Sequence, residues 1–209
     1  VITTSYPEDS SRDRHYPARM TGVRAERRRF LVAPDSFKGT FGAPEVARAI
    51  GAGLAEAGAE ADLCPVADGG EGTAEALRAA LGGEPRRAVV HDPLGREIEA
   101  GYVLLGDGES AAVDTAAASG LPLVDPAERD AEAASTRGSG ELIAAALAAG
   151  ARRVLLAAGG SATTDGGRGA IEALRERGGI GTARLEVLCD VRTPFEDAPK
   201  VFGPQKGAD

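Results

Sequence analysis

The chain has 209 residues, a formal net charge of −8, 43% hydrophobic residues and 27% charged residues. This balance is typical of a globular protein, and the length suffices for one large domain or two small ones with a buried core. The negative charge argues against a nucleic-acid-binding protein, and no apolar run reaches the roughly eighteen residues that would indicate a membrane span. Neither nucleic acid nor a membrane is therefore expected as a partner, and the oligomeric state is left open.

The first residues and the two cysteines bear on the compartment. Residues 1–29 are polar and charged and lack the apolar stretch of a signal peptide, so a disordered leader is predicted. Cys64 and Cys189 have no metal-type spacing, and both follow apolar residues in predicted strands. Buried thiols in a reducing cytoplasm are expected, rather than a disulfide or a zinc site.

The first part of the chain alternates strands and helices. The run 30–33 reads as a strand, and after a loop Pro44 opens an apolar repeat with helical spacing that ends at Gly58. A second strand over 61–65 leads through a glycine-rich loop to a helix over 74–81. The repeated strand–loop–helix order is typical of a parallel α/β protein.

The pattern changes after residue 83. Short strand-like runs at 87–91, 97–105 and 110–113 are separated by turn residues, which favours an antiparallel meander. Residues 84–134 are therefore predicted to form a smaller mixed or antiparallel α+β subdomain.

Helices and strands alternate again from residue 135. The predicted elements are two helices and two strands in alternation, over 141–149, 154–158, 170–177 and 185–189. Residues 30–83 and 135–209 are thus predicted to form one Rossmann-like parallel domain that the subdomain interrupts. The predicted fold class is α/β, with a mostly parallel sheet flanked by helices.

A glycine-rich segment, Ala158–Gly169, lies between a buried-strand pattern and a helix. Its glycines let backbone N–H groups converge, and the helix N-terminus adds partial positive charge, which suits a phosphate or a carboxylate. Ser161, Thr163 and Asp165 add two hydroxyls and a carboxylate, so this loop is a candidate for both an anion and a metal ion. The alternative interpretation is a glycine-rich connection without a ligand.

Several common catalytic motifs are absent from the sequence. There is no Gly-x-x-x-x-Gly-Lys-Ser/Thr motif and no Gly-x-Gly-x-x-Gly after a strand. The nucleophile elbow fails at Thr163, and the only histidines are His15 in the leader and His91 beside a turn. A P-loop protein, a dinucleotide-binding Rossmann site and a Ser-His-Asp hydrolase are therefore disfavoured.

What remains is a set of acids, hydroxyls, lysines and glycines in loops: Asp35, Ser36, Lys38, Asp68, Glu71, Gly159, Gly160, Ser161, Thr163, Asp165, Asp190 and Lys206. Phosphoryl transfer uses such groups, because carboxylates hold magnesium and accept a proton while lysines and N–H groups neutralise phosphate charge. Lysine is scarce, with three among 24 basic residues, which singles out Lys38 and Lys206. The alternative role of the acids, Asp35 and Asp68 above all, is to cap helices or Asx turns.

Motifs spread over residues 30–209 resemble, in order, those of the bacterial glycerate kinase type-1 family. They are Ala33–Gly39, Val66–Thr73, Asp92–Arg96, Ala116–Leu121, Gly140–Ile143, Gly159–Gly167, Cys189–Val191 and Val201–Ala208. That family phosphorylates D-glycerate with ATP and magnesium in a cleft between two α/β domains. The resemblance therefore implies D-glycerate as the small-molecule substrate, and ATP and Mg²⁺ as cofactors.

Under this activity we assign a role to each candidate residue, with Asp190 chosen as the base because it ends a predicted strand with no obvious helix to cap. Lys38 would neutralise the transferred phosphate, and Asp190 would accept the hydroxyl proton. Asp68 and Glu71 would position magnesium. The residues assigned to substrate or phosphate binding are Ser36, Gly159, Gly160, Ser161, Thr163, Asp165 and Lys206.

The sequence departs from the family pattern at several places. Thr164 stands where many members have asparagine, and Thr193 stands where many have asparagine before the proline. Family chains also continue past the position of Asp209, through a Gly-Glu-Gly-Arg-x-Asp motif. A truncated kinase is therefore one interpretation; the alternatives are an inactive anion- or nucleotide-binding module and a kinase of another small hydroxy acid.

Overall fold

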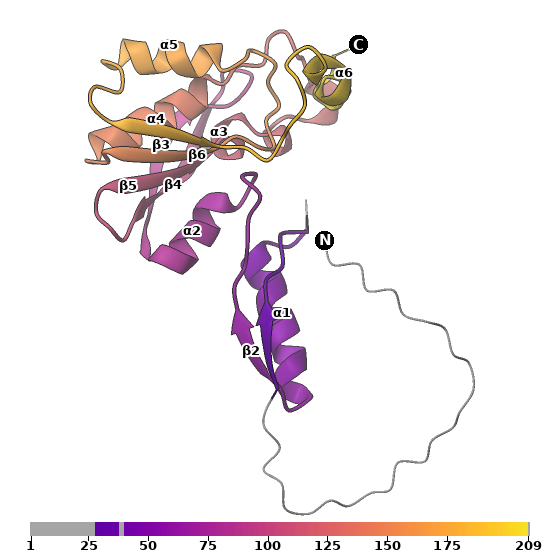
Figure 1. Cartoon of the computed structure of the whole chain (residues 1–209). Coiled ribbons are helices and arrows are strands. Elements are labelled where there is room, and N and C mark those ends of the chain that lie inside the picture. The colour runs from indigo at the N-terminus through magenta and orange to yellow at the C-terminus, as the bar shows by residue number, and fades with distance from the viewer. Residues whose placement is uncertain (1–27, 38–39, 209) are drawn as a thin grey trace, which may run out of the picture.

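The computed structural model describes residues 28–37 and 40–208. Most of the predicted leader, residues 1–29, lies outside the described residues, and Arg29 begins the first strand. The described residues form two sheets, one of two strands and one of five (Figure 1). None of their helices is both long and apolar enough to cross a membrane.

The smaller sheet consists of β1 (Arg29–Val32) and β2 (Glu60–Leu63), which pair in parallel. Helix α1 (Ala43–Glu56) connects the two strands and packs against β2. Its first turn contains the predicted proline, and Gly58, with a φ of 77°, follows its end. This is the strand–helix–strand unit that the sequence predicts, and in Figure 1 it extends away from the larger sheet.

The larger sheet has the strand order β3-β4-β5-β6-β7. Its strands are β3 (Gly83–His91), β4 (Glu97–Leu105), β5 (Ser110–Asp114), β6 (Arg153–Ala157) and β7 (Arg184–Leu188). The first three pair antiparallel, and β5, β6 and β7 pair in parallel. The sheet is therefore mixed, with its parallel half formed by the later strands.

Helices cover both faces of the larger sheet. The longer helices are α2 (Thr73–Leu81), α4 (Arg137–Ala148) and α5 (Arg168–Glu176), and the shorter ones are α3 (Ala116–Ser119) and α6 (Ala198–Phe202). Short 3₁₀ turns span Leu121–Leu123, Pro126–Glu128 and Pro204–Lys206. Helix α4 packs on one face and against α5, whereas α2 packs on β4 and β5. The sequence pattern does not predict α6.

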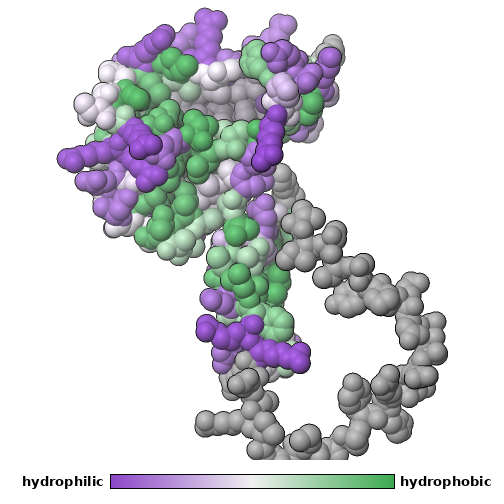
Figure 2. Space-filling model, in the orientation of Figure 1, coloured by the Kyte–Doolittle hydropathy of each residue, from purple (hydrophilic) through white to green (hydrophobic). Residues whose placement is uncertain are grey.

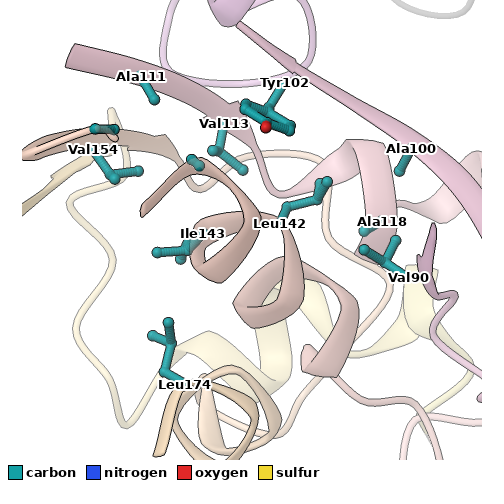
Figure 3. Close-up of a cluster of buried hydrophobic side chains, with 12 residues drawn as sticks. Val90, Ala100, Tyr102, Ala111, Val113, Ala118, Leu142, Ile143, Val154 and Leu174 are labelled. Atoms are coloured by element: carbon teal, nitrogen blue, oxygen red, sulfur yellow. The ribbon is translucent and has the colours of Figure 1, made fainter. Parts of the chain in front are cut away.

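The main core lies between α4 and the larger sheet (Figure 3). Leu142 and Ile143 of α4 are almost completely buried and belong to one apolar cluster with Val113 of β5. Because strand residues alternate between faces, Val103 and Leu155 instead belong to a second cluster with α2. Complete burial of side chains of this size contributes about 1.5–3 kcal/mol each, which makes this sheet a stable platform for its loops.

The strands within residues 84–134 are not separate from those that follow. They form the predicted antiparallel meander, but β5 then pairs in parallel with β6 in the same sheet. The alanine-rich β5 is buried on both faces, with Val113 at 0% exposure on one face and Ala112 at 1% on the other. Because alanine has little β propensity, the sequence does not reveal this strand as the link between the two halves. The domain boundaries stay a prediction.

Both cysteines are free and exposed, so the prediction of buried thiols is wrong. Cys64 and Cys189 each lie one residue past the end of a strand, where the side chain is no longer held in the sheet. The predicted strands extended too far and included both thiols.

Several apolar side chains of the smaller sheet are exposed (Figure 2). Leu31 is 70% exposed and Leu63 is 43% exposed. Parallel sheets are normally covered on both faces, whereas in the described part of the chain α1 is the helix that packs on this two-stranded sheet. The larger sheet therefore supplies most of the core in the described part of the chain.

Candidate active site

The three parallel strands of the larger sheet end in register. Asp114 of β5 lies opposite Ala157 of β6, which lies opposite Leu188 of β7. The loops that follow them therefore begin side by side at one edge of the sheet. In parallel α/β sheets this carboxyl edge is where ligands bind.

The glycine-rich loop that precedes α2 packs against this same edge. The Gly159 N–H donates to the Gly69 carbonyl at 3.0 Å, and the Ala158 N–H donates to the Leu188 carbonyl at 3.0 Å. A Cβ atom on Gly159 would lie 2.6 Å from the Gly70 Cα. The two glycine-rich loops that the sequence singles out, 66–73 and 158–169, are thus in direct backbone contact, and side chains at the crossing would prevent it.

Replacing Gly159 by alanine is expected to lower the free energy of unfolding by about 1–3 kcal/mol, because the added methyl group overlaps backbone that cannot move away alone. Gly101→Ala is the matched control: it lies in β4, where a Cβ atom would lie at an ordinary 3.7 Å from the Arg86 carbonyl oxygen on the neighbouring strand. Urea unfolding of both variants measures the difference. Equal midpoints for the two variants would contradict the close contact.

The 158–169 loop, called the central loop from here on, also forms hydrogen bonds with the segment after β5. The Leu121 N–H donates to the Gly160 carbonyl at 3.0 Å, and the Ala162 N–H donates to the Ser119 carbonyl at 2.8 Å. Within the loop, the Ser161 and Thr163 hydroxyls lie 2.7 Å apart, and the Thr163 N–H donates to the Ser161 Oγ. The loop is therefore preorganised before any ligand binds.

Asp165 is fully engaged by its own chain. Its Oδ2 accepts hydrogen bonds from the Thr136 N–H and hydroxyl at 2.8 Å and from the Gly169 N–H at 3.0 Å, while Oδ1 accepts from the Gly167 N–H. Burial would raise the pKa of the Asp165 carboxyl, but these hydrogen bonds together lower it below its usual value. Asp165 therefore links the first turns of α4 and α5, and through these hydrogen bonds it stabilises the central loop.

Lys206 lies against the central loop, although it is distant in sequence. Its Nζ donates to the Thr163 carbonyl at 2.7 Å. Desolvation lowers the pKa of the Lys206 ammonium, and the nearby Asp165 charge opposes the shift. The 3₁₀ turn that carries Lys206 is held in place by Arg129, whose Nη1 donates to the Gln205 carbonyl at 3.1 Å. The structure thus brings together two candidates that the sequence places far apart.

Asp114 is the site residue that the sequence analysis misses. Its Oδ2 accepts from the Gly72 N–H and its Oδ1 from the Ala74 N–H, both at 2.9 Å. Burial raises the pKa of the Asp114 carboxyl; the two N–H groups oppose this shift, and the charge of Glu71 adds to it. An acid directly after an apolar run, as at Asp190, is the sequence signal for this residue, but the run lies in the predicted antiparallel meander and not in a predicted parallel strand.

The other candidate acids are more open. Asp68 Oδ1 accepts from the Gly70 N–H at 2.9 Å in an Asx turn, and Glu71 is exposed. Asp190 is exposed and lies two residues past the end of β7. Among residues 28–37 and 40–208, no group of three or more His, Cys, Asp and Glu side chains is arranged to hold a metal ion.

The two candidates from the first loop belong to the smaller sheet. Ser36 is half-buried between β1 and α1, and its N–H donates to the neighbouring Asp35 Oδ1 at 2.6 Å. Lys38 lies outside the described residues.

Comparison with known proteins identifies the family of the chain. The sequence profile of the glycerate kinase family matches residues 30–179. The chain belongs to the glycerate kinase family. Its sequence is 40% identical to glycerate 2-kinase of Escherichia coli (strain K12) and 42% identical to glycerate kinase of Bacillus subtilis (strain 168), each over 213 residues.

These matches cover 86% of this glycerate kinase family chain and 56% of each relative, so the chain spans little more than half their length. A crystal structure from Salmonella typhimurium LT2, assigned as glycerate kinase 2, superposes with a TM-score of 0.72 at 38% identity. That match covers 88% of this chain and 58% of the crystal structure's chain.

Proposed function

We propose that this chain phosphorylates D-glycerate with ATP. The observation that carries the proposal is the convergence of two glycine-rich loops on three strand ends in register, with Gly159 bonded to Gly69. Backbone N–H groups and a lysine at such an edge suit a phosphate-bearing nucleotide and a carboxylate-bearing acceptor. Membership of the glycerate kinase family supports D-glycerate as that acceptor.

The loop from Gly159 to Thr163 binds the anionic groups of the substrates. Gly160 and Ser161 offer backbone and hydroxyl donors, and Lys206 supplies a positive charge already held at the Thr163 carbonyl. Asp165 contributes by fixing the loop, because its own oxygens accept four hydrogen bonds within the chain. We assign Ser36 and Lys38 to the same phosphate site from the sequence motif Ala33–Gly39.

Asp190 is the general base of the proposal. An exposed carboxylate just beyond the end of β7 is open to the acceptor, and proton removal makes the hydroxyl oxygen a better nucleophile. The oxygen attacks the terminal phosphorus of ATP, ADP leaves, and the proton remains on the carboxylate until solvent removes it.

Asp68 and Glu71 are the residues that would hold Mg²⁺. The described residues contain no cluster of three candidate ligands, so they do not form an all-protein cage. One or two carboxylates suffice, however, because magnesium usually completes its octahedral shell with water and substrate phosphates. The donor set therefore fits this ion, which supplies charge neutralisation to the phosphates when bound.

An assay of ADP release with purified chain, ATP, Mg²⁺ and D-glycerate tests the function. Glycerate-dependent ADP formation is expected. Turnover with another small hydroxy acid and none with glycerate would reassign the acceptor. Binding of nucleotide by calorimetry with no turnover would favour the inactive binding module.

We also infer a cytoplasmic location, where ATP and reduced thiols are available.

A further inference from the structure

We propose that Asp114 is a positioning residue of the transfer site, which holds the Asp68–Gly72 loop at the carboxyl edge of the sheet. The inference deepens the proposed function and rests on it for the catalytic consequence. The contact itself stands on geometry alone. Asp114 ends β5, in register with Ala157 of β6, and reaches across to the first turn of α2.

Helix α2 has no side-chain cap of its own. Its N-cap is Gly72, which has a φ of 90° and no side chain that could accept from the first N–H groups as serine or aspartate would. The preceding loop supplies one backbone acceptor, the Gly70 carbonyl, to the Thr73 N–H at 3.3 Å. The Asp114 carboxylate takes the place of that cap: its two oxygens accept charge-assisted hydrogen bonds of 2.9 Å, one from the Gly72 N–H and one from the Ala74 N–H. The helix start and the loop before it are therefore fixed by a side chain about forty residues further along.

The reach of this contact distinguishes Asp114 from the acids that accept backbone N–H groups only within their own turns. Asp92 and Asp107 also accept two each, but only from residues two to four positions further along in their own turns. Asp114 links two elements that no local turn connects. Since the Gly69 carbonyl in the same loop accepts from Gly159, releasing the loop at its Asp114 end disturbs the crossing of the two glycine-rich loops.

Two loops connect the Asp114 contact with the proposed binding of the substrates. Asp68 and Glu71 lie in the loop that Asp114 holds, and Gly159 begins the loop assigned to anion binding. A loop that is free to move places these groups correctly only part of the time. The expected defect is in the transfer step and in the binding of Mg²⁺ and ATP, with little change in the affinity for glycerate.

Amide hydrogen exchange of the full chain tests the contact. In the parent protein, the Gly72 and Ala74 amides are expected to be protected, although first-turn amides are normally open to solvent. In Asp114→Asn, one of the two N–H groups faces an NH₂ group instead of an oxygen, and its exchange is expected to be about tenfold faster. Asp107→Asn is the matched control at the other end of β5, and should leave both amides unchanged.

Kinetics of the same variants test the catalytic consequence. Asp114→Asn is expected to reduce kcat about tenfold and to raise the KM for MgATP, while the KM for D-glycerate stays within twofold. Asp114→Glu, which keeps a carboxylate, should recover part of the protection and of kcat. Parent amides that exchange as fast as open loops, or an Asp114→Asn protein indistinguishable from the control, would overturn the assignment. Protected amides in a parent without turnover would instead remove the proposed function and leave the loop contact standing.

Discussion

Asp165→Ala is expected to destabilise the protein by about 2–4 kcal/mol, one of the largest effects of any substitution at the candidate site. The half-buried carboxylate accepts four hydrogen bonds, and its removal leaves donors from Thr136, Gly167 and Gly169 without a partner. Hydrogen bonds to a charged group contribute about 1.5–3 kcal/mol each and are not additive. Because these donors begin α4 and α5, the loss affects the helices that cover the main core.

Urea unfolding measures this effect, with Asp125→Ala as the control. Asp125 also caps a helical turn, but it is exposed and accepts a single N–H, from Ala127 at 2.8 Å. Its replacement should cost about 1 kcal/mol, as expected for an ordinary N-cap. Equal losses in the two variants would show that Asp165 is no more than a local cap.

The contribution of Asp165 also depends on pH in a defined direction. Its pKa is lowered in the folded protein, so folding favours the ionised form. The stabilisation is complete above the unfolded-state pKa, near 3.9, and disappears as the pH falls through the lower folded-state value. The difference in unfolding free energy between the parent and Asp165→Asn should therefore be constant near neutral pH and shrink below about pH 4.

Local patterns in the sequence were sufficient for most elements of the fold. Helical spacing predicts α1, and a strand-like run between turn residues predicts β4, because each pattern is contained within one element. The order of strands was harder, since β5 is mostly alanine and valine and carries no sign of the two partners it pairs with.

In the candidate site, too, local features can be predicted from the sequence and long-range contacts cannot. The glycine-rich loops are visible in the sequence, because the left-handed backbone of Gly69 and Gly160 is a local requirement. The contacts that these loops make with distant residues cannot be predicted in the same way. Nothing in the local sequence indicates that Asp114 caps α2 or that Lys206 donates to Thr163. Asp165 illustrates the limit best, because a carboxylate in a glycine-rich loop suggests a ligand, and only its hydrogen bonds reveal that the chain itself occupies it.

Asp190→Ala is expected to reduce glycerate-dependent turnover by about 10²–10⁴-fold, the usual contribution of a general base. Stability should change by less than about 0.5 kcal/mol, because in the described part of the chain the exposed Asp190 carboxylate makes no hydrogen bond or ion pair. Asp197→Ala is the matched control: Asp197 is also exposed, lies in the same final segment, and makes no capping hydrogen bond at α6. Its turnover should equal that of the parent. A loss of turnover without a loss of stability separates a catalytic carboxylate from a structural one, and an Asp190→Ala protein within a few-fold of the parent would transfer the role of the base to another residue.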